Sequence, residues 1–212
     1  MNDIKKSFIE FTLNHEILKF GNFTLNSGRQ SPYFFNTGLC NDGKKLNELA
    51  SFYSQLIVNH NLEFDFIFGP AYKGIALATS ISSILNSNHN LTKPYCFNRK
   101  EIKTHGDKGI FVGSQPSGNA LIVDDVISSG KSIIESINLL SDNGSSPKIV
   151  VVAFDRMEIG SEQMASLEIK NNYNVNIYSL ITLDDIINYL ATDKSLKKHL
   201  TLMEDYIKQY RG

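Results

Sequence analysis

The chain has 212 residues, a length that fits one α/β domain with a large buried core. Its 21 Lys and Arg residues nearly balance its 22 Asp and Glu residues, and the formal charge of −1 excludes a global attraction to nucleic acid or to an anionic membrane. No apolar run approaches the roughly 20 residues that a membrane-spanning helix needs.

The first residues of the chain show a mixed amphipathic pattern rather than the apolar centre of a signal peptide. Cys40 and Cys96 stand far apart and outside any C-x-x-C pattern, which argues against a disulfide framework and for buried free thiols. We therefore expect a cytoplasmic protein that binds neither nucleic acid nor a membrane.

Apolar residues at helical spacing predict a first helix over residues 3–19, and the alternation over residues 20–36, with Gly and Pro, predicts short strands and turns. A second helix is expected over residues 44–60. Further strands are expected at 64–68, 95–98, 120–123, 149–154 and near 175–181, and further helices at 74–85, 131–143, near 161–171, and after Thr182 and Ser195. Residues 99–113 are expected to form an exposed loop.

Continuous apolar strands that alternate with helices are typical of a mainly parallel sheet with helices on both faces. We therefore predict an α/β fold in a single domain over residues 1–212. The amino-terminal portion departs from this alternation. We expect it to form a small cap, mainly within residues 1–40, over the carboxyl edge of a ligand-binding core at about 44–181.

The most informative segment, residues 120–132, reads A-L-I-V-D-D-V-I-S-S-G-K-S. An apolar strand runs into Asp124 and Asp125, and a small-residue loop then leads into a helix. Ligands of open α/β sheets bind where a strand feeds a helix, and the free N–H groups, serine hydroxyls and helix end suit a phosphate. The two acids can accept hydrogen bonds from vicinal ribose hydroxyls. The segment therefore predicts a site for a sugar that carries a 5′-phosphate.

Two other interpretations apply to this segment taken alone. Gly130-Lys131-Ser132 matches the end of a P-loop, but the first glycine of that motif would fall at position 125. Asp125 would point a carboxylate at the phosphates, so we disfavour the P-loop. An ordinary strand-turn-helix with an acidic turn stays open.

The second informative segment carries four cationic or potentially cationic side chains within seven residues: Arg99, Lys100, Lys103 and His105. Cations placed on a pyrophosphate leaving group stabilise the charge that develops as its bond breaks. Gly106 and Gly109 give hinge-like freedom, and a loop that closes over a reaction excludes water. A solvated basic loop is the alternative, and it is favoured for this segment alone.

Three further features are weaker as single motifs. The turn over residues 69–74 presents Tyr72 and Lys73 before a helix, as many strand-helix turns do. Phe34-Phe35 is either core or a platform for a flat ring. Arg156 follows a predicted strand and offers a planar bidentate donor to a carboxylate, or else pairs with Asp155 at the surface.

In combination these segments resemble the type I phosphoribosyltransferases, which bind phosphoribosyl diphosphate (PRPP). Several blocks are similar to those of bacterial orotate phosphoribosyltransferases, in order and over nearly the whole chain: residues 20–25, 27–29, 31–36, 68–74, 94–101, 105–106 and 155–156. The resemblance implies a type I phosphoribosyltransferase fold with an amino-terminal hood. It also implies Mg²⁺-dependent transfer of phosphoribose from PRPP to orotate.

The resemblance further implies a role for individual residues. Asp124 and Asp125 would hold the ribose hydroxyls and, with Lys103 and His105, act in catalysis. The 5′-phosphate would lie on Val126, Ile127, Ser128, Ser129, Gly130, Lys131 and Ser132. The diphosphate would contact Tyr72, Lys73, Arg99, Lys100, Lys103 and His105, with a strained non-proline peptide in the turn before Lys73. Orotate would lie against Asn26, Phe34, Phe35 and Arg156.

The same resemblance implies a homodimer in which some residues of the cationic segment reach the neighbouring subunit's site. It implies Mg²⁺ held mainly through the substrates, because Mg²⁺ seldom occupies an all-protein cage. A purine phosphoribosyltransferase and a PRPP-sensing regulator of the same fold are the rival functions. Purines carry no carboxylate for Arg156, and the intact cationic set favours catalysis over sensing.

The chain departs from the family pattern at position 131, where Lys131 either adds charge near the 5′-phosphate or faces solvent. At position 128 Ser128 replaces the usual threonine, and either hydroxyl serves. At position 26 the family has a lysine that reaches both orotate and the diphosphate, and this chain has Asn26.

The neutral amide of Asn26 stabilises less negative charge than an ammonium group does, so we predict weaker PRPP affinity or a lower rate than in a lysine-bearing relative. Asn26→Lys is expected to lower KM for PRPP or to raise kcat in steady-state assays. Unchanged values of both parameters would contradict this prediction.

Overall fold

The computed structural model describes residues 3–24, 28–103, 109–193 and 195–211. Its main sheet has six strands in the order β5-β4-β3-β6-β7-β8. These strands are β3 (Phe66–Gly69), β4 (Tyr95–Lys103), β5 (Gly109–Gly113), β6 (Gly118–Ile127), β7 (Ser145–Asp155) and β8 (Asn176–Thr182). All neighbours pair in parallel except β4 and β5. The predicted mainly parallel α/β sheet is confirmed.

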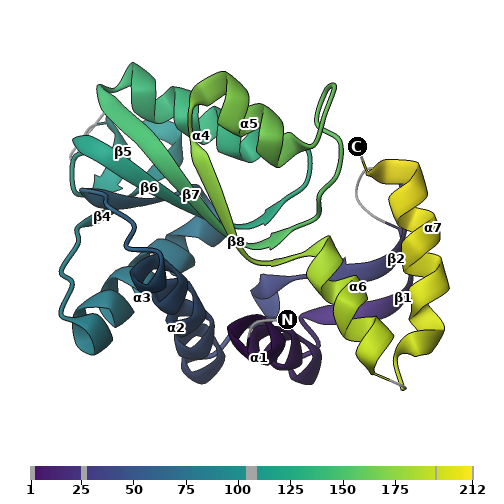
Figure 1. The fold of residues 1–212 in the computed structure, drawn as a ribbon. Helices are drawn as coiled ribbons and strands as arrows, with labels where there is room; N and C mark the ends of the chain where they lie inside the picture. Colours follow the sequence, from purple (N-terminus) through teal and green to yellow (C-terminus); the bar gives the residue numbers. More distant parts are fainter. Residues whose placement is uncertain (1–2, 25–27, 104–108, 194, 212) are drawn as a thin grey trace.

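Helices cover both faces of this sheet (Figure 1). Helices α2 (Gly43–Asn59) and α3 (Lys73–His89) lie on one face, and α4 (Lys131–Asp142) and α5 (Ala165–Tyr173) lie on the other. Alternate side chains of β6 belong to the two separate core clusters, Leu121 and Val123 to one and Ala120 and Ile122 to the other. Burial on both faces explains why the strands read as continuous apolar runs.

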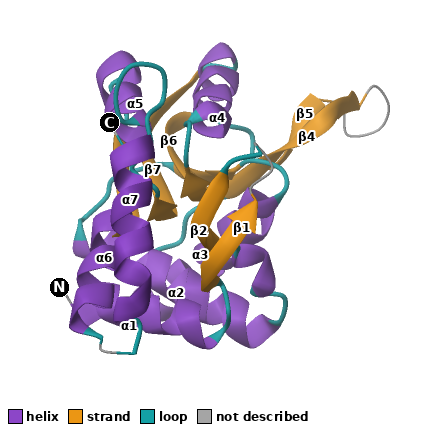
Figure 2. Cartoon of the chain, turned by 90° about the vertical axis from the view of Figure 1, so that its right-hand side faces the viewer, coloured by secondary structure: helices purple, strands orange, loops and turns teal. Residues whose placement is uncertain are grey.

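A second, two-stranded sheet forms from β1 (Leu18–Thr24) and β2 (Gln30–Phe35), which pair antiparallel. Around it lie α1 (Asp3–Asn14), α6 (Leu183–Thr192) and α7 (Leu200–Tyr210), as Figures 1 and 2 show. Two short 3₁₀ helices, η1 (Thr37–Leu39) and η2 (Lys197–His199), complete the element order. The rings of Tyr33 in β2 and Tyr206 in α7 meet edge to face at 5.6 Å, so the carboxyl-terminal helix packs on the amino-terminal strands.

The predicted first helix is correct only in its first part. Helix α1 ends at Asn14, and Leu18 begins a strand instead of a last helical turn. Glu16 adopts a left-handed backbone conformation (φ 56°), which breaks the helix between them. Phe8 and Phe11 are buried from the helix, whereas Leu18 is buried from the strand. The apolar residues therefore keep helical spacing by coincidence across the boundary between α1 and β1.

The predicted exposed loop over residues 99–113 is wrong. Strand β4 continues to Lys103, and β5 returns antiparallel to it, with Phe97 opposite Val112. This hairpin projects from the body of the molecule in Figure 2. Lys100 and Glu101 of β4 are charged and exposed, so the composition of this strand suggested a loop.

Strand β6 also runs further than predicted. The expected strand ended at Val123, but the ladder to β7 continues through Asp124, which lies opposite Val152. Both acids are therefore strand residues, and the loop that follows begins at Ser128. Most other elements occur as expected with shifted or extended ends. No helix among the residues that the structure describes is long and apolar enough to cross a membrane.

Candidate active site

The site lies between β3 and β6, where the order in which the chain adds strands to the sheet reverses. Strand β3 has β4 on one side and β6 on the other, so the chain leaves β3 and β6 in opposite directions. Ligands of open α/β sheets bind in the crevice that such a reversal opens at the carboxyl ends of the strands. The turn after β3 and the loop after β6 flank this crevice. A hydrogen bond of 2.6 Å joins Lys73 Nζ, at the start of α3, to Asp125 Oδ2, near the end of β6.

The two carboxylates of β6 are held by groups from several elements. Asp124 accepts hydrogen bonds from Ser132 Oγ at 3.1 Å and from the backbone N–H of Asp125 at 2.9 Å. Asp125 accepts from Lys73 and also from Thr37 Oγ1 at 3.1 Å. Both residues are only 8% exposed. The acids are thus fixed in place by α3, α4 and η1.

Burial shifts the pKa of Asp124. Burial raises the pKa of Asp124 to about 6, and the neighbouring Asp125 carboxylate raises it as well. The hydrogen bonds from Asp125 N–H and Ser132 and the Lys73 charge act in the opposite direction. Hydrogen bonds donated by a ligand would favour the charged form further. Ribose hydroxyls are donors of this kind.

The loop after β6 borders a hollow of about 300 Å³. Its lining residues are Val126, Ser128, Ser129, Gly130, Lys131, Ser132, Ile133 and Glu135. Gly130 has φ 78°, and a Cβ there would lie 2.8 Å from Ile169 Cδ1, so the tight turn into α4 requires glycine. Loop N–H groups and the helix N-terminus make this hollow suitable for a phosphate.

Two of the residues predicted to bind the 5′-phosphate, Ile127 and Lys131, differ from the others in their surroundings. Ile127 has its side chain buried in the core, and its carbonyl accepts a hydrogen bond from Arg156 N–H at 3.1 Å. The Lys131 side chain is 83% exposed and lies 4.0 Å from Glu135. An exposed pair of this kind adds little stability. Lys131 is exposed to solvent and also borders the hollow, so both alternatives for it stay predictions.

The turn after β3 brings strand and helix unusually close. A Cβ on Gly69 would lie 1.9 Å from the Gly74 carbonyl oxygen, so no larger residue fits. The Ala71–Tyr72 peptide is cis, and Ala71 N–H donates to Asn98 Oδ1 at 2.9 Å. Tyr72 is 69% exposed at this turn.

Three of the predicted diphosphate residues gather beside this turn. Lys100 Nζ lies 4.5 Å from the centroid of the Tyr72 ring. A second hollow, of about 270 Å³, is lined by Pro70, Ala71, Asn98, Arg99, Lys100, Ile110, Ser132, Glu135, Ser136 and Leu139. The buried Arg99 Nε has no hydrogen-bond partner among the described residues. Arg99, Lys100 and Tyr72 thus lie together with a spare donor.

The structure describes only part of the remaining predicted site. Lys103 is the last residue of β4. Asn26 and His105 fall outside the described residues. The hairpin therefore carries the predicted cations from the body of the sheet, at Arg99, outward to Lys103.

The aromatic pair Phe34-Phe35 does not act as one platform. Neighbouring residues of a strand point to opposite faces. Phe34 is 38% exposed and lies against Phe23 with a centroid distance of 5.6 Å, whereas Phe35 packs on Phe154 at 5.1 Å. Phe34 is exposed and Phe35 is partly buried against the core, and Phe35 can contribute its backbone groups.

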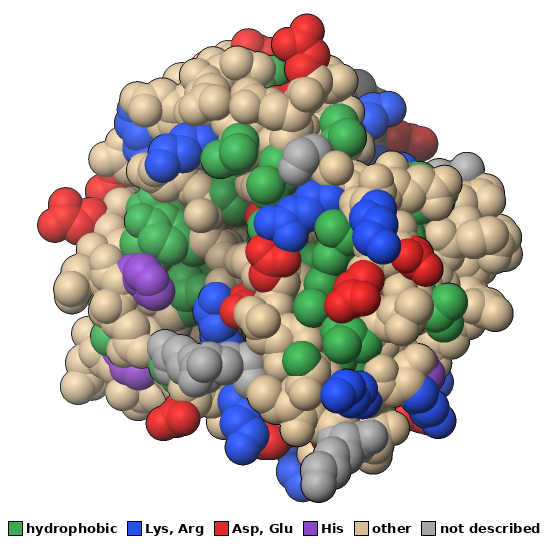
Figure 3. Space-filling view, turned by 45° about the vertical axis from the view of Figure 1, so that its right-hand side comes forward, with side chains coloured by type: hydrophobic (Ala, Val, Ile, Leu, Met, Phe, Trp, Pro, Cys, Tyr) green, Lys and Arg blue, Asp and Glu red, His purple; other side chains and the backbone are tan. Residues whose placement is uncertain are grey.

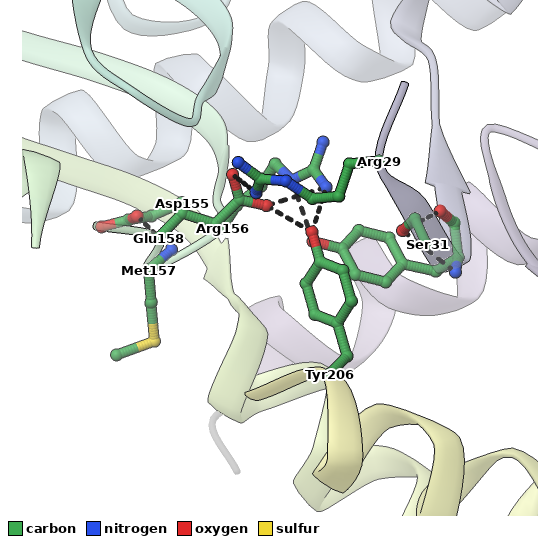
Figure 4. Close-up of polar contacts among 8 residues, drawn as sticks. Arg29, Ser31, Asp155, Arg156, Met157, Glu158 and Tyr206 are labelled. Carbon is green, nitrogen blue, oxygen red and sulfur yellow. Dashed lines mark hydrogen bonds and ion pairs between the residues drawn. The ribbon is translucent and has the colours of Figure 1, made fainter. Parts of the chain in front are cut away.

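Arg156 belongs to a dense polar cluster (Figure 4). Its Nε donates to Tyr33 OH at 2.9 Å, and its Nη2 donates to Tyr206 OH at 2.8 Å and pairs with Glu158 Oε1 at 2.8 Å. Glu158 also binds Arg29 Nη1 at 2.8 Å. The alternative of a surface pair with Asp155 is wrong. Asp155 is buried and accepts instead from Met157 N–H at 2.8 Å.

Sequence reasoning missed Thr37, Arg29, Tyr33, Glu158 and Tyr206. Arg29 and Tyr33 lie inside blocks that supported the family resemblance, so the resemblance could have pointed to them. No local pattern points to Thr37 or Tyr206, because each is distant in sequence from its partner. On the face seen in Figure 3, basic and acidic side chains lie near one another around a central hollow with apolar walls.

A metal would have to be held largely by ligand atoms. No group of three or more His, Cys, Asp or Glu side chains suited to a metal occurs within the described ranges. Asp124 and Asp125 supply carboxylate oxygens, which Mg²⁺ prefers. The residues present therefore fit Mg²⁺ that a polyphosphate brings and these acids help to orient.

Comparisons with known proteins agree with this geometry. The phosphoribosyl transferase domain family matches residues 41–184. The chain is 45% identical over 211 residues to the orotate phosphoribosyltransferase of Cronobacter sakazakii, covering 99% of each chain. It is 49% identical over 208 residues to that of Nitrosomonas europaea, covering 97% of this chain and 91% of the relative. The crystal structure of the Francisella tularensis enzyme of the same name aligns with a TM-score of 0.84 at 38% identity, over 97% of this chain and 96% of the other.

The raised pKa of Asp124 predicts a pH-dependent cost to stability. The native state binds the Asp124 proton more tightly than the unfolded state, so stability falls as pH rises from about 4 to about 6, and the whole cost remains above that range. Asp124→Asn removes the charge. We expect it to raise the free energy of unfolding by about 1–3 kcal/mol near pH 8 and by little near pH 4, while abolishing ligand binding.

Urea unfolding at the two pH values measures this difference. Asp142→Asn, at an exposed position in α4, is the matched control and should change stability little at either pH. An Asp124→Asn effect of equal size at both pH values would contradict the assignment.

Proposed function

The chain belongs to the orotate phosphoribosyltransferase family, and on this premise we propose that it transfers the phosphoribosyl group of PRPP to orotate. The products are orotidine 5′-monophosphate and diphosphate, in a step of pyrimidine nucleotide synthesis. The observation that carries this proposal is the buried pair Asp124–Asp125 beside a phosphate-sized hollow at the reversal point of the sheet.

The pentose phosphate would occupy the end of β6. Its ribose hydroxyls would donate to Asp124 and Asp125, and its 5′-phosphate would enter the hollow formed by Ser128–Ser132. Lys73 lies on Asp125 in the free protein, at 2.6 Å. When a ribose hydroxyl takes its place on the carboxylate, Lys73 becomes available to the diphosphate.

The diphosphate would lie toward the turn after β3 and the β4–β5 hairpin. Arg99, Lys100, Tyr72 and Lys73 are positioned there. Cations fixed beside the leaving group stabilise the charge that develops on it. We assign Lys103 and His105 to the same task on the strength of the family pattern. The protein would act mainly by positioning and charge stabilisation while the bond at C1 inverts through a ribosyl cation-like state.

Orotate would lie between the amino-terminal strands and the end of β7. Backbone groups around Phe34 and Phe35 can read the edges of its ring, and the guanidinium of Arg156 can bind its carboxylate. Phe35 packs on Phe154 at 5.1 Å, two residues before Arg156, so strand β2 packs on the end of β7 that leads to Arg156. A purine carries no carboxylate that the arginine could bind in addition to Glu158.

Mg²⁺ is the cofactor that this proposal requires. It would neutralise charge on the diphosphate, held by diphosphate oxygens, ribose hydroxyls and water, with Asp124 and Asp125 nearby. We place the protein in the cytoplasm. Its two cysteines are free and buried, which suits a reducing compartment.

The β4–β5 hairpin supports a homodimer with shared sites. It projects from its own subunit (Figure 2) and carries the cationic residues that the family pattern assigns to the diphosphate. We propose that the hairpin of one subunit completes the site of its partner.

Orotate absorbance tests the function. Loss of the orotate signal is expected only when enzyme, PRPP, orotate and Mg²⁺ are all present, because each takes part in the transfer. Uracil, hypoxanthine and adenine are the control acceptors and should turn over far more slowly. Turnover of a purine in place of orotate would overturn the proposal.

Subunit mixing tests the shared site. Asp125→Asn and Lys103→Ala should each be nearly inactive alone. After the two are unfolded and refolded together, about a quarter of wild-type activity is expected, because half of the dimers are mixed and each of these holds one intact site. Each variant refolded alone is the control. Absence of any recovery in dimers shown to be mixed would place the hairpin in its own subunit's site.

A further inference from the structure

The polar cluster around Arg156 joins three parts of the chain that are distant in sequence. We define it as Arg29, Tyr33, Arg156, Glu158 and Tyr206. Arg29 directly precedes β2 and Tyr33 lies in β2, Arg156 and Glu158 follow β7, and Tyr206 belongs to α7. Helix α7 is itself fixed to the segment after β7, since Ile159 N–H donates to the Tyr210 carbonyl at 3.2 Å.

The cluster holds more positive than negative charge. Glu158, which is 5% exposed, receives one guanidinium on each oxygen, with Arg29 on Oε2 and Arg156 on Oε1, both at 2.8 Å. Burial raises the pKa of both Tyr33 and Tyr206, so these hydroxyls stay neutral. Two cations against one carboxylate leave a surplus of one positive charge. An anion entering the cluster would balance that surplus.

The cluster also fixes the direction of Arg156. Tyr206 OH donates its only proton to Glu158 Oε1 at 2.6 Å, and it therefore faces Arg156 Nη2 as an acceptor. Tyr33 accepts from Nε on the same edge. Within the described residues Nη1 has no hydrogen-bond partner, so its two protons remain for a ligand. The guanidinium is held in one plane with one free end.

We propose that Tyr206, together with Glu158, is a positioning residue that aims the free end of Arg156 at the carboxylate of orotate. Helix α7 thereby sets the preference for an acceptor with a carboxylate. This inference rests on the proposed function, in which Arg156 receives that carboxylate. Tyr206 itself acts only through the arginine.

A pair of nucleotides isolates this effect. Orotidine 5′-monophosphate and uridine 5′-monophosphate differ only in the carboxylate, so the ratio of their dissociation constants reports that one contact. Tyr206→Phe keeps the ring and removes the hydroxyl. We expect calorimetry to show about tenfold weaker binding of the orotidine nucleotide and unchanged binding of the uridine nucleotide. In kinetics, KM for orotate should rise while KM for PRPP stays constant.

Tyr210→Phe is the matched control, because it removes a hydroxyl one helical turn away and keeps the ring that stacks on Arg29 at 4.4 Å. It should change neither nucleotide's affinity. In an Arg156→Lys background, Tyr206→Phe should have no further effect on the ratio, since Tyr206 acts through the arginine. Unchanged uridine nucleotide binding also shows that the variant is folded.

Several outcomes would overturn the inference. Tyr206→Phe that weakens both nucleotides equally, or neither, shows that the hydroxyl does not aim Arg156. A full effect in the Arg156→Lys background shows that it acts elsewhere. A wild-type protein that turns over orotate but binds the two nucleotides equally removes the inference and leaves the function standing. A wild-type protein that does not turn over orotate removes both.

Discussion

Two carboxylates buried side by side on β6 are the constraint on which the rest of the site depends. Burying charge is unfavourable unless hydrogen bonds and opposite charges offset it. Asp124 and Asp125 obtain these from Ser132, Lys73 and Thr37, which lie at the beginnings of α4, α3 and η1. Three helices must therefore close on the end of one strand before the acids are satisfied. A ligand that brings hydroxyl groups to this position continues the same stabilisation.

The amino-terminal strands do more than cover the sheet. Within five residues, one segment sends Tyr33 to the Arg156 guanidinium and Thr37 to the Asp125 carboxylate. The proposed acceptor site and the proposed ribose site are thus held by the same short stretch of backbone. A displacement of that stretch would disturb the acceptor site and the ribose site together. The two sites are therefore coupled through this stretch of backbone.

The sequence predicted those features of the structure that depend on local residue patterns. The alternation of apolar strands and helices predicted the sheet. The acids and small loop at 124–130 predicted a site for a phosphorylated sugar, and that site stays a prediction. Boundaries were less predictable: Asp124 and Asp125 are polar, yet the ladder to β7 continues through Asp124. The charged strand up to Lys103 was expected as a loop because its pairing with β5 leaves no apolar pattern. Thr37 and Tyr206 could not be found, since their partners are 88 and 50 residues away.

The surplus charge of the Arg156 cluster is tolerable because its two arginines differ in exposure. The Arg29 side chain is 31% exposed and keeps part of its hydration, whereas the Arg156 side chain is 13% exposed and depends on Glu158 and two hydroxyls. A guanidinium does not lose its proton in proteins, so the surplus cannot be relieved by deprotonation. It can be relieved only by an anion. Arg156 must remain charged, and it shares the Glu158 carboxylate with the more exposed Arg29. It can therefore bind a second carboxylate without any proton transfer.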